Sequence, residues 1–337
     1  MLTAQWAPYS LQFKFLARTS REAMRSKPTY FVRLTDSESG RSAWGECALF
    51  RGLSADDTPD YEECLSRACR DASVLPAESS IRFGWESALR SLGDDVAPTP
   101  FMRGEEGIPI NGLIWMGDRV EMRRRIDEKL AAGFHVLKLK IGGIDFDAEV
   151  GLLRYIRGLY SPEALELRLD ANGSFAPEDA LRRLDILSRY SIHSIEQPVK
   201  AGRWDEMARI CRQSPIPVAL DEELIGVTDR AGLLDAVAPQ YIILKPAFCG
   251  GLSGADAWAD EAERRGIGWW ATSALESNVG LYAIARWLSG RGVERPQGLG
   301  TGMLYYNNIA SPLELRGERL YYNPAGRWEY PELPWRQ

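Results

Sequence analysis

The feature that most constrains the fold is a regular alternation that begins near Ile108. Short apolar runs alternate with amphipathic stretches, and the pattern repeats about every 25 residues. The expected strands are Ile110–Ile114, Val136–Ile141, Leu165–Leu169, Ser194–Glu196, Val218–Asp221, Tyr241–Lys245, Gly268–Thr272 and a last one near Gln297–Gly300. Helical runs between them include Arg119–Ala132, Pro177–Ser188, Arg203–Arg212, Thr228–Val237 and Ser253–Arg265. Because buried parallel strands read as continuous apolar runs, the pattern predicts an α/β fold of the (β/α)8 barrel type.

An open, doubly wound nucleotide-binding sheet is disfavoured. Such a sheet carries a glycine-rich phosphate turn after its first strand, where this chain has TrpMetGlyAspArg at 115–119. The run GlyLeuGlyThrGly at 298–302 follows the last strand, and no acidic residue follows it at the spacing of a dinucleotide site.

Residues 1–105 follow another pattern and predict a small α+β domain. Its expected strands are Ser10–Ala17, Thr29–Leu34 and Ser42–Ala48, and its expected helices are Pro59–Ala72 and Ser79–Leu92. Ser79 or Ser80 is the expected cap of the second helix. The segment 94–100 reads as a linker, so we divide the chain into 1–105, a catalytic barrel at 106–305, and a C-terminal segment at 306–337.

Three acids end three successive barrel strands: Asp170, Glu196 and Asp221. The carboxyl ends of barrel strands carry catalytic residues, and neighbouring strands lie about 5 Å apart. Three carboxylates so close need a cation, and an all-oxygen donor set favours Mg²⁺ first and Mn²⁺ second. Asn172 lies two residues after Asp170 and could add an oxygen on the same face. Any one of these acids could be a solvated strand end, but the series Lys, Asp, Glu, Asp, Lys on consecutive strands argues for a site.

Three lysines complete the series. Lys138 and Lys140 share one face of their strand, and Lys245 ends a strand across the barrel. Ammonium groups close to one another and to a divalent cation disfavour each other's protonation, and a lysine with a lowered pKa can act as a base. Simple pairing with the three acids is the alternative, and the desolvation of an ion-pair cluster in a barrel mouth argues against it.

This arrangement predicts chemistry next to a carboxylate. A substrate carboxylate on Mg²⁺ has more acidic α-protons, because the metal stabilises the enediolate that forms. After a lysine removes the proton, either a leaving group departs or a proton returns to the other face. The residues alone leave a lyase and a racemase open.

Charge and cysteine content narrow the partners. The formal net charge is -6, and there is no basic run with interleaved aromatics, so nucleic acid and anionic membranes are disfavoured and a small-molecule carboxylate substrate is favoured. No stretch is long and apolar enough for a membrane span, and no signal peptide is evident. Five scattered cysteines and only two histidines predict reduced thiols in a cytoplasmic protein, without a structural zinc site. A homo-oligomer remains open.

The strand-end residues resemble the enolase superfamily, in its muconate-lactonising-enzyme-like subgroup. The matching segments are TrpGlyGluCys at 44–47, LysLeuLys at 138–140, AspAlaAsn at 170–172, GluGlnPro at 196–198, AspGlu at 221–222 and LysPro at 245–246. Mandelate-racemase-like members use a His–Asp pair on later strands, and this chain has no histidine after His193. The resemblance implies a modified (β/α)7β barrel with an N-terminal α+β capping domain. It also implies that loops near Thr19–Pro28 and Phe50–Asp56 close the mouth, and that residues 306–337 return to the cap.

The resemblance also assigns roles. The three strand-end carboxylates would bind Mg²⁺. Lys140 would remove the α-proton and later protonate the departing hydroxyl group. Lys138 would support the substrate carboxylate and lower the pKa of Lys140, and Lys245 would stabilise the developing enolate from the opposite face.

Within the subgroup, the resemblance favours one dehydration. The segments that carry it are LysIleGlyGlyIleAspPhe at 140–146, AlaLeuAspGluGluLeu at 219–224, SerAlaLeuGluSerAsnValGly at 273–280 and GlyLeuGlyThrGly at 298–302. It implies conversion of 2-succinyl-6-hydroxy-2,4-cyclohexadiene-1-carboxylate to o-succinylbenzoate, a step of menaquinone synthesis. Thr272, Ser273 and Gly298 would contact the succinyl carboxylate, and Arg51 or Arg25 could screen an anionic substrate or be a solvated charge.

Two rival functions are weighed against this one. A racemase or epimerase of N-acylamino acids or dipeptides would use the same fold, but the last strand lacks the Asp-x-Asp that dipeptide epimerases use for the substrate ammonium group. An inactive barrel that serves as a binding module is disfavoured, because all six charged residues are retained.

Overall fold

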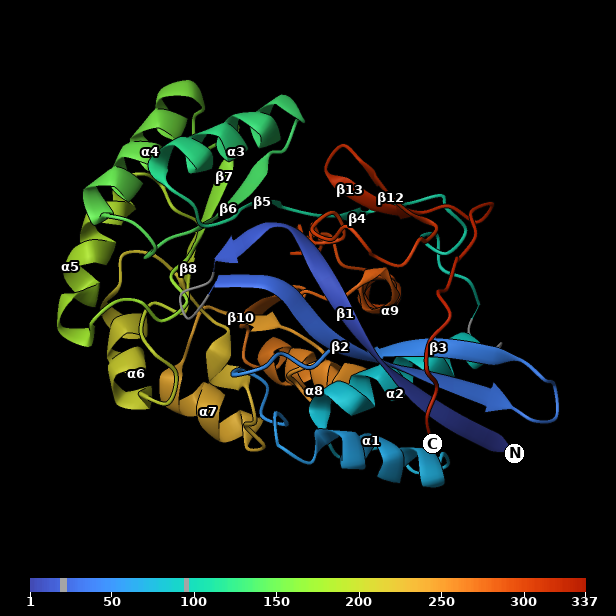
Figure 1. Ribbon diagram of the computed structural model, residues 1–337. Helices are drawn as coiled ribbons and strands as arrows, with labels where there is room; N and C mark the ends of the chain where they lie inside the picture. Colours follow the sequence, from blue (N-terminus) through green and yellow to red (C-terminus); the bar gives the residue numbers. More distant parts are fainter. Residues whose placement is uncertain (19–22, 94–96) are drawn as a thin grey trace.

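The computed structural model describes residues 1–18, 23–93 and 97–337. An antiparallel sheet with two helices sits at one end of a closed parallel barrel, as Figure 1 shows. The expected fold class, a modified (β/α)7β barrel with an N-terminal α+β cap, is confirmed by the seven parallel strands, the bridged eighth segment and the separate antiparallel sheet. Within the described residues, no helix is both long and apolar enough to cross a membrane.

The cap is built on a long two-stranded ribbon. Strand β1 (Leu2–Arg18) pairs with β2 (Ala23–Asp36), which also pairs with β3 (Ser42–Cys47). The first two strands are longer than expected, and residues 23–28, expected in a mouth loop, belong to β2. The reason is backbone pairing. Leu11 lies opposite Lys27, and pairing resumes at Ala17 and Met24 after a shift of register, although the segment lacks apolar alternation. Residues 19–22 of the expected loop and 94–96 of the expected linker lie outside the described part of the chain.

Two helices, α1 (Tyr61–Arg70) and α2 (Ser79–Leu92), cover the sheet of the cap. The expected serine cap of α2 is wrong. The N-cap residue is Glu78, and Ser80 instead bonds Asp56 through both its backbone N–H and its hydroxyl group. Helix α2 and strand β3 approach so closely that a Cβ at Gly45 would lie 1.8 Å from the carbonyl oxygen of Gly84. Only glycine fits at that crossing.

The barrel strands lie in sequence order and run parallel. Those described as strands are β5 (Gly112–Ile114), β6 (Val136–Lys140), β7 (Glu166–Asp170), β8 (Ser194–Glu196), β9 (Val218–Leu220), β10 (Tyr241–Leu244) and β11 (Gly268–Ala271). Segment 297–300 closes the barrel, through a parallel bridge from Gly298 to Thr272 and one from Gln297 to Ile110. The eighth strand thus exists as single bridges between β11 and β5.

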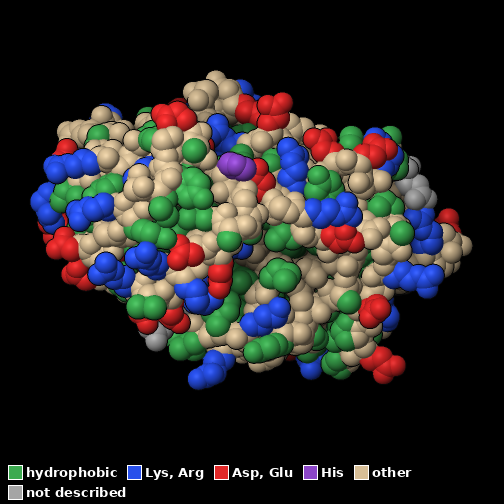
Figure 2. Space-filling view, turned by 90° about the horizontal axis from the view of Figure 1, so that it is seen from above, with side chains coloured by type: hydrophobic (Ala, Val, Ile, Leu, Met, Phe, Trp, Pro, Cys, Tyr) green, Lys and Arg blue, Asp and Glu red, His purple; other side chains and the backbone are tan. Residues whose placement is uncertain are grey.

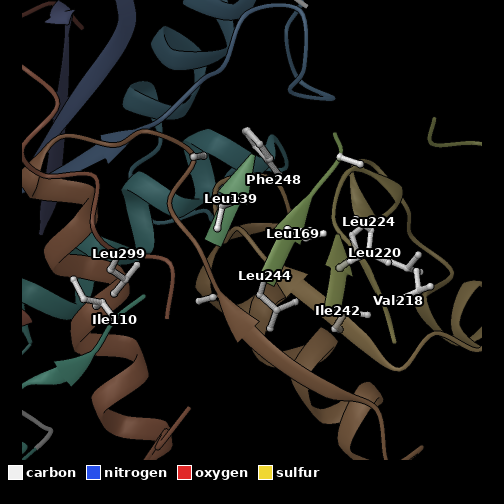
Figure 3. Close-up of a cluster of buried hydrophobic side chains, with 14 of the residues drawn as sticks. Ile110, Leu139, Leu169, Val218, Leu220, Leu224, Ile242, Leu244, Phe248 and Leu299 are labelled. Atoms are coloured by element: carbon white, nitrogen blue, oxygen red, sulfur yellow. The ribbon is translucent and has the colours of Figure 1, made fainter. Parts of the chain in front are cut away.

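Helices alternate with the strands and form the outer layer. They are α3 (Arg119–Ala131), α4 (Phe146–Leu159), α5 (Pro177–Ser188), α6 (Trp204–Gln213), the short η1 (Glu222–Leu224), α7 (Arg230–Val237), α8 (Gly251–Glu263) and α9 (Asn278–Arg291). Figure 3 shows apolar side chains of the barrel, such as Leu139, Leu169 and Leu244, which are buried between strands and helices. The two tryptophans of β11 have different surroundings: Trp269 contacts Trp287 of α9, whereas Trp270 lies under the Arg168 guanidinium.

The C-terminal segment links both parts. Strand β12 (Leu313–Arg316) pairs with β13 (Arg319–Tyr322), which pairs with β4 (Ile108–Pro109) at the start of the barrel. The last residues reach the cap, where Arg336 bridges to Trp6. The two termini therefore lie close together, as Figure 1 shows.

A buried carboxylate joins the cap to the barrel. Glu46 of β3 accepts hydrogen bonds from the backbone N–H groups of Ser277 and Gly280 at the start of α9, and from the Ser277 hydroxyl group. It also accepts one from the Thr29 hydroxyl group of β2. A carboxylate at a helix N-terminus is favoured by the helix dipole. The contact therefore holds the cap in a fixed position over the barrel.

Charged side chains of both signs lie on the face seen in Figure 2. On the face shown in Figure 2, Lys and Arg side chains are interspersed with Asp and Glu rather than gathered in one patch.

Candidate active site

A pocket opens at the carboxyl ends of the barrel strands. Its lining comprises Phe50, Leu53, Asn111, Leu113, Trp115, Lys138, Lys140, Asp170, Asn172, Glu222, Lys245, Phe248, Thr272, Ser273, Ala274, Leu275, Gly298, Gly300 and Thr301. All three predicted lysines and the predicted contacts Asn172, Thr272, Ser273 and Gly298 line it. Of the two expected cap loops, the one at 50–56 contributes Phe50 and Leu53. The pocket wall thus comes from both the cap and the barrel.

The two arginines considered from the sequence do not line this pocket. Arg51 pairs instead with Asp57 and donates a hydrogen bond to the Tyr30 hydroxyl group. Arg25 is exposed on β2. Their side chains are therefore accounted for outside the pocket.

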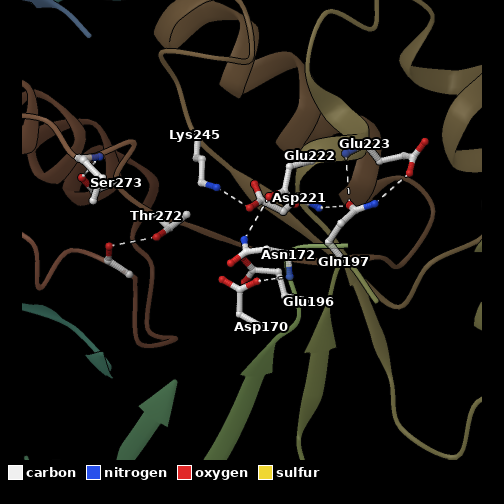
Figure 4. A network of polar contacts seen from close by, with 12 residues as sticks. Asp170, Asn172, Glu196, Gln197, Asp221, Glu222, Glu223, Lys245, Thr272 and Ser273 are labelled. Carbon is white, nitrogen blue, oxygen red and sulfur yellow. Dashed lines mark hydrogen bonds and ion pairs between the residues drawn. The ribbon is translucent and has the colours of Figure 1, made fainter. Parts of the chain in front are cut away.

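The three predicted acids lie together on neighbouring strands. Asp170 and Glu196 are paired residues of β7 and β8, and Asp221 directly follows β9. Their exposed fractions are 1%, 2% and 2%. Figure 4 shows Asp170, Glu196 and Asp221 turned toward one region at the strand ends.

Each acid contacts a lysine. The Lys138 Nζ lies 3.1 Å from an Asp170 oxygen and 2.7 Å from a Glu196 oxygen. The Lys140 Nζ lies 3.1 Å from Asp170, and Lys245 pairs with Asp221. The sequence prediction that these six side chains meet at one place is thus in agreement with the structure.

Electrostatics tie the cluster together. Burial disfavours the charged form of Lys138, but the carboxylates of Asp170 and Glu196 outweigh it and raise its pKa. Burial also opposes the charge of Lys245, yet Asp221 and other carboxylates raise its pKa. This differs from the expected lowering between neighbouring lysines, because at Lys138 the attraction to Asp170 and Glu196 outweighs the repulsion from Lys245. In the opposite direction, Lys138 and Lys140 overcome burial and lower the pKa of Asp170.

The donor set fits a hard divalent cation. Among the described residues, no three acidic, histidine or cysteine side chains already surround one point as metal ligands, because lysines stand between these acids. Burial, and then the charge of Asp170, raise the pKa of Glu196 well above its usual range. Lys138 therefore compensates the negative charge of this buried carboxylate only in part, and a cation would supply further positive charge. Asp170, Glu196 and Asp221 offer only carboxylate oxygens, the donors that Mg²⁺ prefers.

Two residues that follow strand ends hold the acids in place. Gln197 (φ 39°) follows Glu196 and accepts hydrogen bonds from the backbone N–H groups of Asp221 and Glu223. Asn172 (φ 43°) accepts a hydrogen bond of 2.8 Å from Lys140 and donates one to Glu222. A positive φ at a non-glycine residue is strained backbone that the surroundings must enforce. Through these hydrogen bonds, both side chains link the end of their own strand to the segment that follows β9, as Figure 4 shows.

Glu222 is a pocket residue for which the sequence indicated no role. It lines the pocket beside Asn172, and its Oε2 has no hydrogen-bond partner among the described residues. Burial, and then the charge of Asp221, raise its pKa to about 7. The AspGlu pair at 221–222 was the available signal, but a sequence does not show which way the second acid points.

Glu149 of α4 holds the loop after Lys140. Its Oε1 accepts hydrogen bonds from the backbone N–H groups of Gly142 at 2.6 Å and Gly143 at 3.2 Å. The side chain is buried, and its Oε2 has no partner among the described residues. Burial raises the pKa of Glu149 to about 7, although the N–H groups work in the other direction.

Comparison with known proteins identifies the family to which this arrangement of residues belongs. Residues 121–303 match the family model described as enolase C-terminal domain-like. That range covers more than half of the chain and includes every predicted lysine and acid of the site. A crystal structure of a dipeptide epimerase from Cytophaga hutchinsonii, complexed with Mg and D-Ala-L-Val, has a TM-score of 0.80 at 20% identity and covers 99% of this chain and 97% of that one. At that identity the likeness shows the fold alone.

Two further matches are much more similar. The o-succinylbenzoate synthase of Desulfotalea psychrophila is 44% identical, over 91% of this chain and 95% of the relative. The crystal structure of MenC from the same organism has a TM-score of 0.83 at 41% identity and covers 95% of this chain and 99% of that one. The chain therefore belongs to the enolase superfamily and, within it, to the o-succinylbenzoate synthase family of lyases. The family resemblance of the strand-end motifs is confirmed.

Proposed function

We propose that this protein catalyses the dehydration of 2-succinyl-6-hydroxy-2,4-cyclohexadiene-1-carboxylate to o-succinylbenzoate, with Mg²⁺ and a lysine base, in menaquinone synthesis. The observation that carries the proposal is the cluster of three buried acids and three lysines at the pocket. The similarity to the Desulfotalea psychrophila synthase supports this substrate.

The metal has one task in this proposal. Held by Asp170, Glu196 and Asp221, Mg²⁺ would stabilise the negative charge that develops on the substrate carboxylate when the α-proton leaves. The Mg named for the Cytophaga hutchinsonii epimerase supports the choice of ion.

Lys140 is the proposed base. Its side chain is 15% exposed, against 6% for Lys138 and 13% for Lys245, so it is the most accessible of the three. Its Nζ is held by Asp170 and Asn172 beside the Trp115 ring, whose centroid lies 5.7 Å away. Lys140 would take the α-proton and then give a proton to the departing hydroxyl group, which leaves as water.

The other two lysines would stabilise charge. Lys245 comes from β10 and faces the pocket from the side opposite β6, so its ammonium group would lie against the enolate from the other face. Lys138 is almost fully buried and bridges two acids, which suits a fixed positive charge near the substrate carboxylate. Because elimination makes the ring aromatic, one base and this fixed charge suffice.

The proposed location of the protein is the cytoplasm. All five cysteines are buried and none forms a disulfide, which supports a reducing cytoplasm.

The racemase is the second candidate, since lysines lie on two sides of the pocket. An epimerase that acts on a dipeptide needs a carboxylate for the substrate ammonium group. Segment 298–301 contributes only Gly298, Gly300 and Thr301 to the pocket, which disfavours that substrate.

The test is the ultraviolet loss of the cyclohexadiene substrate in Mg²⁺, repeated with chelator and with Lys140→Ala. We expect turnover that chelation abolishes and that Lys140→Ala lowers by a factor of about 10³ or more. The exposed Lys200→Ala is the matched control and should retain full activity. A wild-type protein that leaves the diene intact in Mg²⁺ would refute the proposed reaction, and assays of N-acylamino acid and dipeptide racemisation would then decide for the second candidate.

A further inference from the structure

The pocket has a charged side and a neutral side. The charged residues of its lining, Lys138, Lys140, Asp170, Glu222 and Lys245, all come from the stretch of barrel between β6 and β10. The remaining arc runs from the end of β11 through segment 297–301 to β5, and its lining residues are all uncharged. A substrate carboxylate held on the charged side leaves the rest of the molecule to this neutral arc.

Two hydroxyl groups of the arc are already engaged. Thr272 Oγ1 donates to the carbonyl oxygen of Gly298 at 3.1 Å. Ser273 Oγ donates to Glu276 and accepts from the backbone N–H groups of Leu275 and Glu276. A hydroxyl group has one proton to donate. The hydroxyl protons of Thr272 and Ser273 are therefore both donated to acceptors within the protein.

Two other polar side chains of the arc each have an oxygen atom without a hydrogen-bond partner among the described residues. Asn111 and Thr301 are only 2% and 3% exposed, and both line the pocket. Asn111 Oδ1 and Thr301 Oγ1 make no hydrogen bond with any residue that the structure describes. Buried polar groups are nearly always paired in folded proteins, and an unpaired one costs stability. Unpaired groups in a pocket wall are what a ligand would satisfy.

A glycine keeps this wall open. A Cβ at Gly300 would meet only the carbonyl oxygen of Asn111 at 3.6 Å and a methyl group of Ile110 at 3.9 Å, which are ordinary contacts. The protein would therefore accept alanine at this position, and the added methyl group would take up room in the wall of the pocket. The missing side chain at Gly300 leaves space beside Asn111.

We propose that Asn111 and Thr301, with the space at Gly300, form the subsite for the oxygen-bearing acyl arm of the substrate that lies away from the reacting carbon. This inference rests on the proposed function and adds the residues that determine its specificity. The Thr301 hydroxyl group can donate a hydrogen bond to a ketone or carboxylate oxygen, and the Asn111 amide can do so through its Nδ2, while its Oδ1 only accepts. The arc offers no carboxylate for an ammonium group, so it selects an acyl arm over an aminoacyl one.

The test compares two ligands that differ by the arm. Binding of o-succinylbenzoate and of benzoate in Mg²⁺ is measured by titration calorimetry for wild type, Asn111→Leu, Thr301→Val and Gly300→Ala. The first two variants keep the shape of the side chain and remove its hydrogen bonds. Thr228→Val, at an exposed residue outside the pocket, is the control for the same atomic change.

We expect Asn111→Leu and Thr301→Val to weaken o-succinylbenzoate binding by roughly fivefold or more, as for one lost hydrogen bond, and to leave benzoate unchanged. Gly300→Ala should weaken the larger ligand alone. The melting temperatures of Asn111→Leu and Thr301→Val should stay level or rise, since each replaces an unpaired buried polar group with an apolar one. A merely structural role would lower them.

The outcomes separate the subsite from the reaction. Wild-type turnover of the diene together with unchanged o-succinylbenzoate affinity in all three variants overturns the subsite and leaves the proposed function standing. Absence of turnover together with selective weakening of o-succinylbenzoate supports the subsite and overturns the reaction. A wild-type protein that binds the two ligands equally overturns the subsite, whatever the variants do.

Discussion

Glu149 provides a test of how burial changes the pKa of a carboxyl group outside the reacting groups. Its carboxyl group, of ordinary pKa 4.5, has a pKa of about 7 in the folded protein. Between these values the folded state therefore holds the proton more tightly than the unfolded state. The stability that this proton contributes is fully present below pH 4.5 and is lost as the pH rises toward and through 7.

The magnitude follows from the two pKa values. A shift of about 2.5 units corresponds to about 3 kcal/mol in total, of which about 2.5 kcal/mol is lost between pH 5 and pH 8. Glu149→Gln keeps an oxygen for the N–H groups of Gly142 and Gly143 and does not titrate. We therefore expect its free energy of unfolding, relative to wild type, to improve by that amount from pH 5 to pH 8.

The assay is urea unfolding followed by tryptophan fluorescence at the two pH values. Taking the difference between variant and wild type cancels the titration of all other groups. Glu178→Gln, which removes an exposed carboxylate from the first turn of α5, is the control for loss of a surface charge. If Glu149→Gln and wild type lose stability in parallel between pH 5 and pH 8, the reasoning from burial is refuted.

Three other predictions follow from the structure. Mg²⁺ added to chelator-treated protein at 100 times its dissociation constant should increase the free energy of unfolding by about 2.7 kcal/mol, which a thermal scan detects as a higher melting temperature. Asp221→Asn should abolish most of this increase. Gly45→Ala should destabilise the protein by about 4 kcal/mol or more, because its Cβ would overlap the backbone of Gly84. Soluble yield and circular dichroism would report the loss of folded protein. Glu46→Gln weakens charge-assisted hydrogen bonds to Ser277 and should cost about 1.5–3 kcal/mol in urea unfolding, so unchanged stability would contradict its role in joining cap to barrel.

Much of the barrel could be predicted because its strands are buried on both faces. A strand such as Val218–Leu220 is apolar up to Asp221 at the site, so the residue pattern indicates both its position and its end. The same logic placed the acids and lysines, since a charge that ends a buried strand must point toward the mouth. The cap ribbon was predicted less well. Residues 23–28 belong to β2 through backbone pairing with β1, which the side-chain pattern does not reveal.

The details of the pocket depended on tertiary contacts. Asn111 and Thr301 give no sequence signal, because their importance lies in the hydrogen bonds that they do not make. Ser273 lines the pocket, and the sequence did not show that its hydroxyl group donates to Glu276, three residues further along. Such pairing depends on side-chain directions after folding, and the residue types alone do not determine it.

The closure of the barrel has a consequence for how this enzyme can diverge. Segment 297–300 joins its neighbours by single bridges at Gln297 and Gly298. In contrast, the strands β6, β7 and β8, which carry two of the lysines and two of the acids, are paired in parallel ladders, and these side chains are linked by ion pairs. A change on the charged side disturbs several partners at once, but a change at a position such as Gly300 meets only ordinary contacts. Segment 297–300 is thus the part of the pocket wall in which single residues can change with few effects on their neighbours. Substitutions there can alter substrate specificity while the residues of the proton chemistry stay the same.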